Sequence, residues 1–142
     1  MEDRVDEATI KAIPLFRGMK GKELGQIASV FSFYEFPAGA TILKWGDPGT
    51  SLFIILEGQV QVTQPGRPLV TLGPNEFFGE LGAIGFHQTR SVDVVALGRC
   101  RCIVSTPGAF PLLVARYPQL SRAIMSEVRE RYREGETGSS QP

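Results

Sequence analysis

Residues 51–63 read Ser-Leu-Phe-Ile-Ile-Leu-Glu-Gly-Gln-Val-Gln-Val-Thr, and this stretch carries the clearest structural signal in the chain. Its first six residues form a mostly apolar run, which is typical of a buried strand. A Glu-Gly pair interrupts the run, and the next five residues alternate, which places Val60 and Val62 on one face. The stretch therefore predicts two short strands separated by a break.

Further short apolar segments lie on both sides of this pair. They cover residues 41–43, 69–72, 92–97 and 101–105. Clusters of glycine, proline and aspartate separate them, and such residues mark turns. A series of short strands with turns between them predicts a mainly β fold, an antiparallel sandwich, barrel or jelly roll, over residues 37–106.

Helical spacing of apolar residues appears at both ends of the chain. We expect helices within residues 1–36 and again within residues 107–134, and a disordered polar tail over residues 135–142. Together with the strands they make one domain over residues 1–134. The last helix has an apolar stripe made of Leu120, Ile124, Val128 and Tyr132.

Composition excludes several classes of function. The chain has 142 residues, and its 15 Lys and Arg balance its 15 Asp and Glu, so no overall positive field attracts nucleic acid. No apolar run is long enough for a membrane span, and residues 1–8 lack the apolar segment of a signal peptide. We therefore expect a cytoplasmic protein without a nucleic-acid or membrane partner.

The two cysteines, Cys100 and Cys102, are two positions apart in a predicted strand, so both point to the same face. A disulfide at this spacing has poor geometry. The chain has a single histidine, His87, so a metal site with several imidazole ligands is not available. We interpret the cysteines as two small buried apolar residues and expect no metal.

The chemistry is concentrated in residues 78–91. Gly79 and Gly82 allow the backbone to approach a ligand closely. Arg90 offers a permanent charge and a planar fork suited to phosphate oxygens. Glu80 would repel a phosphate, but it can accept a hydrogen bond from a hydroxyl group. The combination favours a sugar phosphate as the ligand. Taken alone, Glu80 could be an acidic residue in the first turn of a helix, and Arg90 could be a solvent-exposed charge at a strand edge.

The order and spacing of these residues resemble the phosphate-binding cassette of the cyclic nucleotide-binding domain family. That cassette reads Phe-Gly-Glu-aliphatic-Ala/Gly, then a short loop, then Arg-Ser/Thr/Ala-Ala. Residues 78–82 and 90–91 follow it. Residues 13–16, 37–39, 46–49 and 57–60 resemble the N-terminal helix and β-turns of the same family. The resemblance covers about residues 10–133.

The resemblance implies an antiparallel β-roll, a double-stranded jelly-roll-like fold with N-terminal helices and a C-terminal lid helix. It implies that Glu80 accepts the ribose 2′-hydroxyl and that Arg90 pairs with the exocyclic phosphate oxygens. The ligand-binding residues implied or inferred are Gly79, Glu80, Leu81, Gly82, Arg90, Ser91, Val92, Val128, Arg131 and Tyr132.

Two positions depart from the family pattern. Val92 replaces the usual alanine and would narrow the pocket if it faces the ligand. Asp93 stands where threonine is frequent and would weaken binding if it lies near the phosphate. Ser91, after the arginine, has a hydroxyl but no methyl group, so it permits either base; we expect cAMP to be favoured and cGMP to be possible.

The sequence thus predicts a regulatory sensor that binds a cyclic nucleotide, passes the signal through its C-terminal helix and performs no catalysis. Its partner would be an effector domain in a longer parent or a complex, such as a channel, kinase or transporter. We expect no DNA binding, because only the polar tail follows Arg133. The alternative is a degenerate domain of the same fold that acts only in protein–protein contacts.

Overall fold

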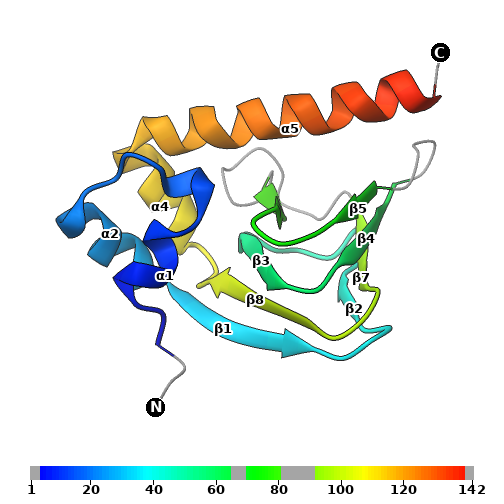
Figure 1. The fold of residues 1–142 in the computed structure, drawn as a ribbon, viewed down its shortest axis with the longest axis horizontal. Helices are drawn as coiled ribbons and strands as arrows, with labels where there is room; N and C mark the ends of the chain where they lie inside the picture. The colour runs from blue at the N-terminus through cyan, green and yellow to red at the C-terminus, as the bar shows by residue number, and fades with distance from the viewer. Residues whose placement is uncertain (1–3, 65–69, 81–91, 140–142) are drawn as a thin grey trace.

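The computed structural model describes residues 4–64, 70–80 and 92–139, with side chains described as far as Arg131. Short helices gather at one end of the molecule, and two antiparallel sheets form a roll beside them (Figure 1). A long C-terminal helix runs across the top of both parts in this view. The structure therefore confirms the mainly β fold with flanking helices.

The N-terminal helices are α1 (Glu7–Lys11), the 3-10 turn η1 (Pro14–Phe16) and α2 (Gly21–Ala28). Asp6 caps α1, because its carboxylate accepts a 2.8 Å hydrogen bond from the backbone N–H of Thr9. The helical region predicted for residues 1–36 is too long. Residues Phe31–Phe36 instead form strand β1, because four aromatic rings favour an extended backbone and a partner strand lies alongside.

The first sheet has the strand order β1-β8-β3-β6. The strand predicted from the apolar run is β3, and the strand predicted over residues 101–105, which includes Cys102, is β8. The short strand β6, which leads into residue 79, was not predicted. The bounds are β3 Phe53–Glu57, β6 Phe77–Phe78 and β8 Cys100–Ser105.

The second sheet has the strand order β2-β7-β4-β5, and all its pairs are antiparallel. Each of its strands was predicted, with bounds that differ by no more than two residues at either end. Val60 and Val62 of β4 are both buried, as the alternation predicts. The bounds are β2 Thr41–Leu43, β4 Val60–Thr63, β5 Val70–Leu72 and β7 Asp93–Ala96.

Two apolar cores result, one between the sheets and one between the first sheet and the helices. Strand β8 serves both: Cys100 and Cys102 are buried between the sheets, and Ile103 packs against the helices. Both cysteines are free, their sulfur atoms lie 3.7 Å apart, and burial raises the pKa of each thiol. The prediction that they are buried apolar residues is confirmed.

Two helices follow the sheets, α4 (Ala109–Arg116) and α5 (Pro118–Ser139). The stripe residues Leu120, Ile124 and Val128 are buried in the core between helices and sheet. Residues 135–139 were predicted to be disordered, but α5 continues through them, because extending a formed helix gains one backbone hydrogen bond per residue. Among the described residues, no helix has the length and apolar character needed to cross a membrane.

Candidate functional site

The site begins at β6, which carries the chain into the cassette. Phe77 and Phe78 anchor it on opposite faces, the first in the helical core and the second between the sheets. Strand β6 pairs with the start of β3, and the ring of Phe78 stacks on that of Phe53 with centroids 4.9 Å apart. The position of the residues after Phe78 is therefore fixed by the packed roll.

Gly79 turns the backbone between β6 and Glu80. Its φ of +80° lies in the left-handed region, where a side chain is strained. Because glycine adopts this conformation without strain, Glu80 can follow strand β6 directly. The side chain of Glu80 is buried. The sequence predicted a glycine that permits close approach, and the structure shows the backbone conformation that needs it.

Glu80 faces the C-terminal helix. Oε2 of Glu80 lies 3.7 Å from Nη1 of Arg131, and the two side chains are only 7% and 11% exposed. Nη2 of Arg131 donates a 2.9 Å hydrogen bond to the carbonyl oxygen of Phe77, and the guanidinium lies 5.2 Å from the centre of the Phe77 ring. One arginine thus holds α5 against both β6 and the first cassette residues.

This contact was not predicted from the sequence. Glu80 and Arg131 were both expected to contact a ligand, but nothing in the pattern showed that they pair with each other. Because each is almost fully enclosed, the positive charge offsets the cost of burying the carboxylate. The pairing joins the residue predicted to contact the ribose to the helix predicted to act as a lid.

The sequence left open which of Val92 and Asp93 faces the interior of the roll, and the structure shows this. Val92 is half-buried and packs against the core between the sheets. Asp93 belongs to the opposite face, and its carboxylate accepts a 2.6 Å hydrogen bond from the backbone N–H of Trp45 in the turn after β2. The valine therefore faces the interior of the roll, whereas the aspartate is held by a turn on the other face.

The remaining predicted residues lie in different places. Val128 is one turn before Arg131 and is buried among the helices, where Leu120 and Ile124 also pack. The side chain of Tyr132 lies outside the described part. So do the residues expected to contact the phosphate, namely Leu81, Gly82, Arg90 and Ser91, and His87 with them.

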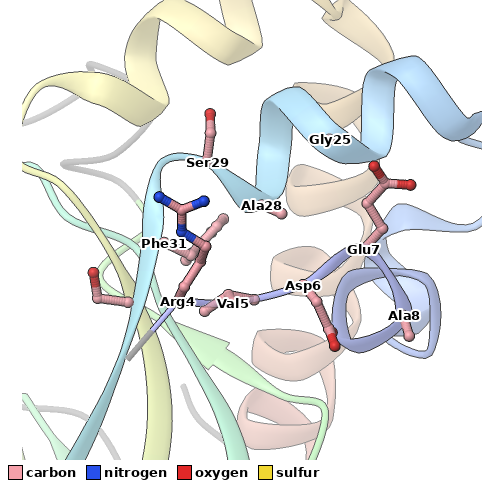
Figure 2. A pocket seen from close by; sticks show the side chains of 10 residues that line it. Arg4, Val5, Asp6, Glu7, Ala8, Gly25, Ala28, Ser29 and Phe31 are labelled. Carbon is pink, nitrogen blue, oxygen red and sulfur yellow. The ribbon is translucent and has the colours of Figure 1, made fainter. Parts of the chain in front are cut away.

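Three cavities are lined by described residues, and Glu80 is not among their lining residues. One, of about 830 Å³, is formed by the N-terminal segment, α2 and the start of β1 (Figure 2). Two others, about 540 and 440 Å³, share Ile42, Phe53 and Pro107 at the β1–β2 side of the roll. Within the described ranges, no three His, Cys, Asp or Glu side chains gather as a metal site would require.

Comparison with known proteins decides the family. Residues 33–117 match the family model of the cyclic nucleotide-binding domain. The chain belongs to the cyclic nucleotide-binding domain family. The family predicted from the cassette and turns is therefore confirmed, as is the β-roll architecture.

Three relatives illustrate the match. A cyclic nucleotide-gated potassium channel of Mesorhizobium japonicum is 31% identical over 86% of this chain and 34% of its own length. A cyclic AMP receptor protein of Thermus thermophilus is 29% identical over 89% of the chain and 61% of its own length. The crystal structure of a cyclic nucleotide-binding domain from Methylobacillus flagellatus superposes with a TM-score of 0.72, at 25% identity, over 97% of the chain and 81% of that structure.

The chain spans about a third of the channel and less than two thirds of the receptor. In both relatives, the shared region is one part of a larger protein. What the domain would regulate is therefore a separate question from what it binds.

Proposed function

We propose that this domain is a regulatory sensor that binds cAMP, with cGMP as a weaker ligand, and transmits binding through α5. The observation that carries the proposal is the buried contact between Glu80 in the cassette and Arg131 in α5. This contact joins Glu80, which would bind the ribose, to α5, which would transmit the binding event. The relatives named for cyclic nucleotides support the choice of ligand class.

Glu80 would accept a hydrogen bond from the 2′-hydroxyl of the ribose. An ionised carboxylate can only accept, and a sugar hydroxyl can donate, so the pair is chemically matched. Burial strengthens such a charge-assisted bond, because water competes less for either group. The guanidinium of Arg131 lies 3.7 Å from the carboxylate, a distance too long for a strong direct hydrogen bond, and its positive charge favours the ionised form that accepts from the ribose.

Arg90 would neutralise the exocyclic phosphate oxygens. The backbone N–H of Gly82, and the N–H and hydroxyl of Ser91, would complete the phosphate contacts. Val92 would form part of the apolar wall, since it faces the interior of the roll. Ser91 has a hydroxyl but no methyl group, so it permits either base, and the relative named as a cyclic AMP receptor protein supports placing cAMP first.

Transmission would begin at Arg131. A ribose hydroxyl bound to Glu80 changes the charge environment of the guanidinium, which also holds the carbonyl of Phe77. Val128 packs in the core one turn earlier, so it fixes the helix up to that point. We therefore assign the ligand-sensitive part of α5 to Arg131, Tyr132 and the residues after them, which would close over the base. A ligand shifts such an equilibrium only through contacts that favour one state.

An effector domain would receive the signal, within a longer parent or in a complex, and the domain would act in the cytoplasm. A channel is one such parent, because the potassium-channel relative carries a region of this kind. The domain itself would perform no reaction; its output is the position of α5.

Isothermal titration with cAMP, cGMP and linear AMP tests the proposal. We expect micromolar or tighter binding of cAMP, weaker binding of cGMP and much weaker binding of AMP, which lacks the cyclic phosphate. Absence of binding by both cyclic nucleotides would contradict the proposal and favour the degenerate domain that acts only in protein contacts. A preference for cGMP beyond about tenfold, or about 1.4 kcal/mol, would contradict the assigned base selectivity.

A further inference from the structure

Arg131 binds the backbone of β6 on the side that faces away from β3. The N–H of Ile55 donates a 2.9 Å hydrogen bond to the carbonyl oxygen of Glu76 across the β3–β6 pair. Residues of an antiparallel pair alternate in facing the partner strand, so the carbonyl of Phe77, the next residue, points away from β3. Nη2 of Arg131 donates a 2.9 Å hydrogen bond to that carbonyl. The arginine therefore satisfies a backbone group that the β3–β6 pairing does not use.

The ring of Phe77 meets the same guanidinium. Its centre lies 5.2 Å from Cζ of Arg131, within the range of about 6 Å over which the negative face of an aromatic ring attracts a cation. Phe77 is fully buried and the arginine side chain is only 11% exposed, so little water competes for the charge. One residue thus binds Arg131 with both its carbonyl and its ring.

These two contacts do not involve Glu80. Nη1 of Arg131 faces the carboxylate of Glu80, whereas the carbonyl and the ring belong to the strand that precedes the cassette. Phe77 is itself held in the core between the helices and the first sheet. In Figure 1, α5 leaves the N-terminal helices and continues over the roll, and Val128 packs in the same core one turn before Arg131. Phe77 therefore connects the helix beyond Val128 to a fixed part of the roll.

We propose that Phe77 is a positioning residue, whose ring and carbonyl set how firmly Arg131 holds α5 against the cassette and thereby set the affinity for the nucleotide. The part of this inference that concerns affinity rests on the proposed function. If the nucleotide binds the state in which α5 covers the cassette, its apparent affinity scales with the fraction of molecules in that state. A weaker hold on Arg131 lowers that fraction and raises Kd by the same factor.

A phenylalanine that only fills the core would behave differently. Such a ring stabilises the fold through its volume and its apolar surface, which ring fluorination changes little. The attraction for a cation depends instead on the negative charge of the ring face, which each added fluorine reduces by withdrawing electrons. Graded fluorination of Phe77 therefore separates the two roles.

The test replaces Phe77 by phenylalanine analogues with one, two and three ring fluorines. Amide hydrogen exchange at residues 131–133 is measured without nucleotide, and the cAMP Kd is measured by calorimetry. We expect both the exchange rate and Kd to rise step by step, with Kd at least about fivefold higher for three fluorines. The same series at Phe110, which is also fully buried in the helical core and contacts the ring of Phe31, should change either quantity by less than about twofold.

An Arg131→Gln variant tests whether the ring acts through the guanidinium. The glutamine amide keeps an N–H donor and removes the positive charge, so the fluorine series at Phe77 should become flat in this variant. Thermal unfolding shows whether the variant folds. If it does not, the comparison of the Phe77 and Phe110 series in the otherwise unaltered chain decides the question.

The proposal is overturned if exchange at residues 131–133 stays constant across the Phe77 series, or if the Phe77 and Phe110 series change equally. A gradient of the same slope in Arg131→Gln also overturns it, because the ring would then act through another group. Stepwise exchange with a constant Kd, in a chain that binds cAMP, overturns the link to affinity. If exchange rises stepwise but the unmodified chain binds no cyclic nucleotide, Phe77 holds α5 as proposed and the proposed function fails instead.

Discussion

Arg131 of α5 and Glu80, which follows β6, form a buried ion pair with Nη1 and Oε2 3.7 Å apart. The same guanidinium donates to the carbonyl of Phe77 and lies over the Phe77 ring. The arginine therefore connects the C-terminal helix to the start of the cassette by charge, hydrogen bond and ring contact.

Arg131→Ala should destabilise the fold as well as weaken ligand binding. Removing one partner leaves the Glu80 carboxylate buried without its counter-charge, which costs about 3 kcal/mol in comparable buried pairs. Urea unfolding measures the loss. Arg129→Ala, at an exposed position of the same helix, is the control and should change stability by less than about 0.5 kcal/mol. Equal decreases in the free energy of unfolding in the two variants would show that the buried contact with Glu80 does not stabilise the fold.

Arg90→Ala should remove most cAMP binding. The arginine is the cation at the cassette position that the family uses for phosphate, and truncating one member of a buried charged pair costs about 2–5 kcal/mol. The affinity measured by calorimetry should fall about 30-fold or more. Arg99→Ala serves as the control, because Arg99 forms an exposed pair with Glu35 on the surface. Unchanged affinity in Arg90→Ala would refute the assignment of the phosphate site.

The contributions of Glu80 and of the ribose 2′-hydroxyl to the binding free energy should be coupled. Glu80→Gln should weaken cAMP binding less than Arg90→Ala, because an amide oxygen still accepts a hydrogen bond and only the charge assistance is lost. The wild type should bind 2′-deoxy-cAMP more weakly than cAMP. The Glu80→Ala variant should bind the two ligands with nearly equal affinity, because the group that contacts the hydroxyl is already absent. A double-mutant cycle gives the coupling free energy. Fully additive losses would mean that the two groups do not meet.

Gly58→Ala should destabilise the roll strongly. Gly58 has a φ of +92°, and an added Cβ would lie 2.4 Å from the carbonyl oxygen of Arg99. The backbone strain alone costs about 1–3 kcal/mol, and the clash with a backbone atom adds to it. Gly98→Ala is the matched control, since a Cβ there meets nothing within 4 Å. Similar unfolding midpoints for both variants would be inconsistent with the described turn.

The sequence predicted what periodicity and turn residues can report. The apolar run at β3, the alternation in β4 and the shared face of the two cysteines were all correct. Strand β1 was missed because Phe31 continues the helical spacing of Leu24, Ile27 and Ala28, so the pattern gave no sign that the helix had ended. Strand β6 has two residues and is too short for any period.

The candidate site was only partly visible in the sequence. The residue types in the cassette indicate sugar and phosphate chemistry, and Gly79 does adopt the left-handed backbone expected of a close approach. The ion pair between Glu80 and Arg131 could not be predicted, because its partners lie in distant segments that only the packing of α5 brings together. The orientations of Val92 and Asp93 likewise depended on the strand register, which the sequence left open.

Amide hydrogen exchange with and without saturating cAMP tests the central claim most directly. If the domain binds the nucleotide at Glu80 and transmits binding through α5, exchange should slow across residues 79–91 and 131–133. Exchange in β3, Phe53–Glu57, should change little, because that strand is already paired on both sides within the packed roll. Slower exchange in the cassette with no change in α5 would show that the signal leaves by another route. Identical exchange in both segments with and without cAMP would contradict the account.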